Sequence, residues 1–192
     1  MSAASGSPRV DPRIDQSRRL VLRAAIEQLA AAGFGGLTIE AVAERSGVAK
    51  STIYRHWPDK HALIADAFEA AHHDAVPSIA GLSARDGLEQ LLQHVAEVAA
   101  DPVFSPAIPA LVEGSERNSR LRDFQHRYSL SRRQSVVELI ERGVASGEFA
   151  ARQNPQLAAQ LLIGLIFYQR LMTSEPFDPA SAGELIDAVL GR

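Results

Sequence analysis

The chain has 192 residues, 46% of them hydrophobic, and no cysteine. Disulfides and thiolate chemistry are therefore excluded, and the length allows one good core or two small ones. The formal net charge is −3, but residues 1–60 carry nine lysines and arginines against six acidic residues. Because the local field steers a protein to phosphate, the acidic total does not exclude a nucleic-acid partner for the basic N-terminal end.

The first segment, residues 1–13, is small, polar and interrupted by proline, and we expect a disordered N-terminal arm. It lacks the apolar segment of a secretory signal, so the expected location is the cytoplasm.

Residues 14–32 are predicted to form the first helix. Val21, Leu22, Ala25, Ile26 and Leu29 recur at helical spacing, and Gly33 follows as a stop signal. This helix is expected to pack across the next two helices and so complete a three-helix domain over residues 14–60.

Residues 38–63 have the pattern of a helix-turn-helix. Thr38 is placed to cap a short helix, and Gly47 supplies the left-handed backbone conformation that ends it. A second short helix begins near Lys50 and ends before Pro58. Two short helices joined by a glycine-containing turn form the unit that lays its second helix in the major groove of DNA.

The second helix of this unit has one apolar face and one hydrogen-bonding face. Ile53 and Trp57 lie four residues apart and face the core. The remaining surface holds Lys50, Ser51, Thr52, Tyr54, Arg55 and His56. From spacing alone, an ordinary helical hairpin with a solvated polar face is the alternative interpretation.

A wider set of residues within 19–68 forms a recognisable pattern: Ala25, Gly33-Phe34, Thr38, Val42-Ala43, Gly47-Val48, Thr52-Ile53-Tyr54, His56-Trp57, Lys60 and Leu63. This pattern closely resembles the N-terminal pattern of the TetR family of bacterial transcriptional repressors. Two departures are Ser51, where the family usually has Gly or Pro, and Trp57, where it usually has Phe.

The resemblance implies a DNA-binding transcriptional regulator, usually a repressor. It assigns phosphate contacts to Thr38, Tyr54, His56 and Lys60. The candidates for base edges are Lys50, Ser51, Thr52 and Arg55, with lysine or arginine on guanine as the expected pairing.

Residues 61–192 are predicted to form a helical regulatory and dimerisation domain, which gives an all-α fold of about nine helices. The fourth helix opens at Pro58 and Asp59 and runs to about Ala75. A helix over 103–113 is expected to be irregular because it contains Pro106 and Pro109. The other helices are expected over 83–101, 119–146, 155–172 and 180–190.

The helix over 155–172 is apolar on nearly all sides. It is too short for a membrane span, which needs about 20 apolar residues, and a small domain cannot easily bury all of it. We therefore expect a homodimer through the last two helices, with 180–190 supplying the other half of the interface. Such a dimer presents two recognition helices and requires a palindromic DNA operator.

The resemblance also implies that the second domain receives an unknown small-molecule effector. The aromatic and polar candidates for its pocket are His94, Phe104, Phe124, Tyr128 and Tyr168. A DNA-binding dimer that responds to no ligand remains an open alternative.

An enzyme is the alternative from a different class. The sequence lacks Gly-x-Ser-x-Gly, His-Glu-x-x-His and Walker motifs. His94 and Glu97 are three apart, a spacing found in helical-bundle metal enzymes, but those sites need a second such pair and further carboxylates. We therefore expect no catalysis, no metal and no cofactor, and interpret this pair as lying on a solvated helix.

Overall fold

The computed structural model describes residues 12–73, 77–150 and 154–191, and within these ranges the chain forms nine α-helices, one short 3-10 helix and no strand. The predicted all-α fold is confirmed. The helices are α1 Pro12–Gly36, α2 Ile39–Ser46, α3 Lys50–His56, α4 Lys60–His73, α5 Ala84–Ala100, α6 Ala107–Arg117, α7 Ser119–Ser146, α8 Pro155–Met172 and α9 Ala182–Leu190, with the 3-10 helix at Pro179–Ser181.

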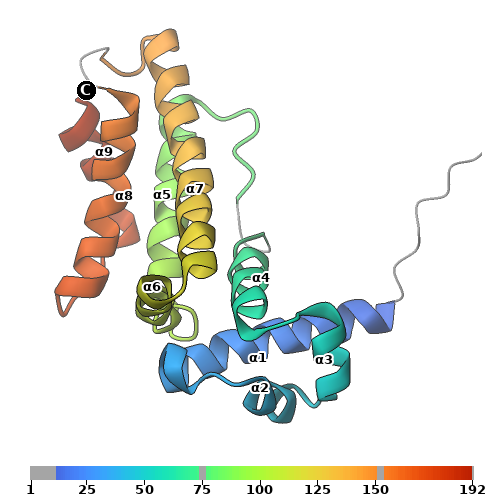
Figure 1. The fold of residues 1–192 in the computed structure, drawn as a ribbon. Coiled ribbons are helices and arrows are strands. Elements are labelled where there is room, and N and C mark those ends of the chain that lie inside the picture. Colours follow the sequence, from blue (N-terminus) through green and yellow to red (C-terminus); the bar gives the residue numbers. More distant parts are fainter. Residues whose placement is uncertain (1–11, 74–76, 151–153, 192) are drawn as a thin grey trace, which may run out of the picture.

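The helices form two connected bodies. Figure 1 shows α1 lying across the base of α4 and α6, with α2 and α3 on its other side. Helices α5 and α7 stand upright beside α4, and α8 and α9 lie at the end away from it. Helix α4 therefore connects the helix-turn-helix unit to the upright bundle.

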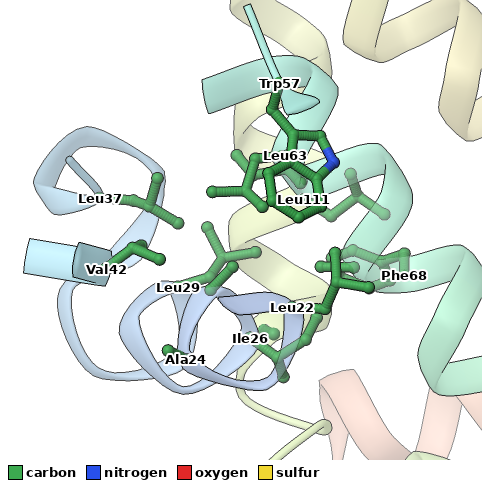
Figure 2. Close-up of a cluster of buried hydrophobic side chains, with 14 of the residues drawn as sticks. Leu22, Ala24, Ile26, Leu29, Leu37, Val42, Trp57, Leu63, Phe68 and Leu111 are labelled. Carbon is green, nitrogen blue, oxygen red and sulfur yellow. The ribbon is translucent and has the colours of Figure 1, made fainter. Parts of the chain in front are cut away.

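The first hydrophobic core joins the N-terminal helices to part of the bundle. Leu29, Leu37, Ile53 and Leu63 are fully buried in it, and Leu111 of α6 packs against the same cluster (Figure 2). This core therefore crosses the domain boundary expected at residue 60.

The second core lies among α5, α7, α8 and α9. Leu88, Leu92, Ile140, Leu162 and Ile186 are buried there. The C-terminal half of α7 contributes to this core, whereas Leu121 and Phe124 near its N-terminus belong to the first. Helix α7 thus connects the two cores.

Helices α1 and α6 approach closely because Gly114 has no side chain. A Cβ atom there would lie 2.5 Å from the Phe34 ring and 2.7 Å from Leu121. A side chain would force the two helices apart, so this glycine fixes the contact between the DNA-binding domain and the bundle.

The backbone leaves the helical conformation at Gly33, with φ +68°, where the sequence predicts the end of the first helix, and a short helical segment follows to Gly36. Helix α6 runs from Ala107 to Arg117 instead of 103–113. Pro106 occupies its N-cap position without a side-chain cap hydrogen bond, and Pro109 lies in its first turn. Proline is tolerated there, since the first N–H groups of a helix have no intrahelical partner.

Two further expectations concern other parts of the chain. The predicted N-terminal arm lies outside the described residues as far as residue 11. Within the described ranges, no helix combines the length and apolar character needed to cross a membrane.

Candidate nucleic-acid interface and effector cavity

The turn between α2 and α3 has the geometry that its sequence predicts. The Thr38 hydroxyl accepts a hydrogen bond from the Ala41 N–H at 3.1 Å and so caps α2. Gly47 ends α2 in the left-handed region, with φ +69°. The Val48 N–H then donates to the Ser46 hydroxyl at 3.3 Å. These contacts hold the two short helices at a defined angle.

Two buried side chains hold α3 against the first hydrophobic core. Ile53 is fully buried and Trp57 is 3% exposed. The Trp57 indole N–H donates to the Asp66 carboxylate of α4 at 2.9 Å, and the Arg18 guanidinium of α1 donates to the same carboxylate at 2.6 Å. The Arg18 guanidinium also lies 5.8 Å from the centre of the indole ring. Asp66 therefore ties α1, α3 and α4 together.

The roles of Arg18 and Asp66 as positioning residues are not predicted by the sequence pattern. The available signal was indirect: a buried indole N–H needs an acceptor, and Asp66 is the acid that follows the apolar Leu63, Ile64 and Ala65 of α4. Their pairing depends on tertiary structure, since 48 residues separate Arg18 from Asp66.

The opposite face of α3 is exposed and polar. Tyr54 is 50% exposed, although aromatic side chains are usually buried more fully. Thr52 is half-buried beside Arg55 and His56. The predicted DNA-contacting residues that are exposed are Thr38, Lys50, Ser51, Tyr54, Arg55 and His56.

Lys50 is held by an acidic neighbour in the free protein. Its ammonium lies 3.1 Å from the Glu40 carboxylate, and both side chains are exposed. A backbone hydrogen bond at Glu40 itself, and then Lys50, lower the pKa of this carboxyl. An exposed ion pair is weak, so the Lys50 side chain can leave Glu40 for a base edge or phosphate at little cost.

Lys60 lies apart from the α3 surface. Its ammonium donates to the carbonyl oxygens of Phe34 and Leu37, at 3.0 and 3.3 Å, and lies 4.5 Å from the centre of the Phe34 ring. An ammonium has three donors, so one N–H remains for a phosphate. Lys60 therefore also fixes the connection between α1 and α2.

A cavity of about 660 Å³ lies between α1, α4 and α5. Helices α1 and α4 contribute mainly apolar or small side chains. Helix α5 contributes His94, Glu97 and Val98, and Asp101 follows directly after it. The lining residues are Arg19, Leu22, Arg23, Ile26, Ala67, Ala70, Ala71, His94, Glu97, Val98, Asp101, Val103 and Phe104.

His94 is the buried polar group of this cavity. Its side chain is 8% exposed, and its Nε2 atom has no hydrogen-bond partner among the described residues. Burial lowers the pKa of His94, and the positive charge of Arg132 lowers it further, whereas Glu97 acts in the opposite direction. The imidazole is therefore neutral at neutral pH.

The cavity contains only some of the predicted effector residues. His94 and Phe104 line it, whereas Phe124, Tyr128 and Tyr168 are not among its lining residues. Phe124 and Tyr128 pack together with ring centres 5.4 Å apart, and Tyr128 also contacts Phe68. Tyr168 is 59% exposed on α8. The Phe104 ring also contacts Phe68, so Phe104, Phe124 and Tyr128 belong to one aromatic cluster, and Tyr168 lies apart from it.

The predicted solvent exposure of the His94 and Glu97 pair is wrong for His94. Glu97 is exposed, but His94 is buried and lines the cavity between α1, α4 and α5. In the part of the chain that the structure describes, no three histidine, cysteine or acidic side chains gather as metal ligands.

His94 should make the stability of the protein depend on pH. Because its folded-state pKa lies below the unfolded value, the unfolded chain takes up the proton first and stability falls as the pH drops below about 6.5. We expect His94→Gln to show a smaller decrease in melting temperature between pH 7.5 and pH 5.5 than the unaltered protein. Equal decreases in the two proteins would contradict a buried neutral imidazole.

A helix-turn-helix with an exposed, polar second helix, joined to an all-helical body, defines a DNA-binding transcriptional regulator. Comparison with known families agrees. Residues 21–67 match the model of bacterial regulatory proteins of the tetR family, and residues 81–189 match the tetracyclin repressor-like C-terminal domain. The chain belongs to the TetR family.

Individual relatives cover nearly the whole chain. The HTH-type transcriptional regulator YdeS of Bacillus subtilis is 28% identical over 94% of this chain and 91% of its own. The DNA-binding transcriptional repressor TetR of Mycobacteroides abscessus is 28% identical over 88% of this chain and 90% of its own. A crystal structure from Rhodococcus sp., described as a TetR-family regulator, superposes with a TM-score of 0.75 at 26% identity, covering 92% of this chain and 99% of that one.

Proposed function

We propose that this protein is a transcriptional repressor that acts in the cytoplasm, binds a palindromic operator as a homodimer and is released by a small-molecule effector. The observation that carries the proposal is the surface of α3, where Lys50, Tyr54 and Arg55 project into solvent while Ile53 and Trp57 are buried below. The similarity to a named repressor supports the sign of regulation.

Helix α8 offers the surface for dimerisation. Its exposed apolar residues repeat every three or four positions and so form one stripe along the helix. Leu161 in the middle of this stripe is 51% exposed. The stripe comprises Leu157, Leu161, Leu165, Tyr168 and Met172.

The expected contribution of α9 to the interface changes in the light of the structure. Leu185, Ile186 and Leu190 are buried against their own subunit, and Val189 is half-buried in the same core. The apolar side of α9 is thus already buried within its own subunit, and the proposed interface consists mainly of the α8 stripe. A two-fold axis there would place two α3 helices in successive major grooves, about 34 to 36 Å apart.

The cavity is positioned to couple an effector to DNA binding. It contacts α1 of the DNA-binding domain, the connecting helix α4 and α5 of the bundle. A ligand that fits one relative position of these helices better than another shifts the distance between the two α3 helices, and ordinary coupling requires a preference of about 1 to 3 kcal/mol. We propose this cavity as the effector site.

The proposed roles on α3 can be separated by two substitutions. Tyr54→Ala should weaken binding to operator and random DNA by a similar factor, because a phosphate contact carries no sequence information. Lys50→Ala should relax base preference at particular operator positions, by about 1 to 3 kcal/mol. Fluorescence anisotropy with operator and shuffled duplexes measures both. An equal loss on both duplexes for both variants would contradict this division of roles.

A further inference from the structure

We propose that the cavity between α1, α4 and α5 binds an amphipathic organic carboxylate, with its carboxylate at His94 and its apolar body along α1 and α4. This inference deepens the proposed function and relies on it only for the consequence that binding weakens operator affinity. The binding itself follows from the chemistry of the cavity.

The walls of the cavity suit an apolar body. Leu22 and Ile26 come from α1, and Phe104 follows α5. Helix α4 contributes only the alanines Ala67, Ala70 and Ala71. Because these side chains are small, they leave space beside the helix. A volume of about 660 Å³ lies within the range of small-molecule sites.

His94 supplies a hydrogen-bonding group at the buried side. Buried polar atoms in native proteins nearly always have a partner, and a lone one indicates a missing group. Its Nε2 atom has no hydrogen-bond partner in the described ranges. A neutral imidazole has one N–H, which a carboxylate oxygen can accept from Nε2.

Arg132 of α7 makes an anion the favoured head group. Its guanidinium lies 4.4 Å from the centre of the Tyr128 ring, and its Nε and Nη2 atoms are buried without hydrogen-bond partners in the part of the chain described. Burial lowers the pKa of Arg132, whereas Tyr128 and Glu69 act in the opposite direction. The positive charge of Arg132 in turn lowers the pKa of His94. A carboxylate at His94 would be attracted by the same charge, and a cation would be repelled.

The cavity rim does not select a charge. The rim carries Arg19 and Arg23 on α1, Glu97 on α5 and Asp101 directly after α5, and all four residues are exposed. The Oδ1 atom of Asp101 already accepts hydrogen bonds from the N–H groups of Val103 and Phe104, at 2.9 and 2.6 Å. The opposite charges of the rim offset each other, so His94 and Arg132 determine which head-group charge the cavity prefers.

Three probes with the same decyl chain test the inference: decanoate and decyltrimethylammonium below their micellar concentrations, and decan-1-ol below its solubility limit. Isothermal titration calorimetry on the full chain should give a Kd for decanoate at least about tenfold lower than for decan-1-ol. Decyltrimethylammonium should bind most weakly. Equal affinity for decanoate and decan-1-ol would overturn the carboxylate, and no saturable binding of decanoate would overturn the site.

Variants locate the binding. Arg132→Met should reduce the preference for decanoate over decan-1-ol to within about threefold, whereas the neighbouring Arg133→Met should leave it unchanged. Ala70→Leu, which fills the cavity, should weaken decanoate and decan-1-ol at least about tenfold. Unchanged binding in Ala70→Leu would place the probes elsewhere and contradict the inference. The comparison of the three probes uses the unaltered protein, so it remains a valid test even if a variant fails to fold.

Operator binding, measured separately without any probe, distinguishes the inference from the proposed function. If the protein binds an operator but no decanoate, only the inference fails. If it binds decanoate but no operator, the proposed function fails and the cavity assignment survives.

Discussion

Leu161→Glu is expected to convert the proposed homodimer into a monomer and to lower operator affinity by at least about 100-fold, the scale on which linking two binding modules raises avidity. Leu161 lies in the middle of the exposed apolar stripe of α8. By two-fold symmetry the substitution places two carboxylates in the interface, where burial without partners is costly. Light scattering coupled to size exclusion reports the mass, and fluorescence anisotropy reports operator affinity.

Leu130→Glu is the matched control for this substitution. Leu130 is 55% exposed on α7, close to the 51% of Leu161, but it lies within a polar run of that helix. The control should remain dimeric and retain operator binding. A dimeric Leu161→Glu protein, or a monomer that binds the full operator with unchanged affinity, would contradict the α8 interface.

Trp57→Ala is expected to lower the free energy of unfolding by about 3 to 5 kcal/mol, the usual cost of truncating a buried aromatic residue. Trp57 packs into the first core under α3 (Figure 2), and its indole N–H donates to Asp66. The substitution leaves a cavity beneath α3 and removes its link to α4. Operator binding should fall together with stability, as measured by urea denaturation and anisotropy.

Trp57→Phe separates packing from the hydrogen bond. Phenylalanine keeps most of the apolar contact but cannot donate to Asp66, which still pairs with Arg18. We expect a loss of about 0.5 to 1.5 kcal/mol, the net value of one hydrogen bond. If Trp57→Phe destabilised the protein as much as Trp57→Ala, the packing of the indole ring would not be the main stabilising contact.

The DNA-binding domain could be predicted in detail because its signals are local. Thr38 caps α2 with its own side chain, Gly47 ends the helix by its own backbone preference, and Pro58 restricts Trp57 before it. The apolar spacing of Ile53 and Trp57 identified the buried face of α3 and therefore also its exposed face. These inferences need only neighbouring residues.

The contacts between the domains could not be predicted in the same way. Asp66 meets Trp57 and Arg18 only because α1 and α4 pack together, and Lys60 reaches the carbonyls of Phe34 and Leu37 across the same junction. A helical pattern identifies an apolar face but not the helix that covers it.

The proposed effector cavity and the burial of α9 could not be predicted because both depend on which helices pack against each other. Choosing aromatic residues as pocket candidates overlooked the alanines of α4, which create the space beside α1 and α5. The apolar residues of α9 were assigned to a partner, although α5 and α8 of the same subunit bury them. Predicting either feature requires the relative positions of the helices.

The most direct test of the central claim is the selection of genomic DNA fragments by the purified protein at two salt concentrations. Dimeric recognition by two α3 helices predicts one enriched palindromic sequence, with half-sites one helical turn apart and an affinity that falls as salt rises. Weak retention of fragments without a common sequence would contradict specific DNA recognition by this surface.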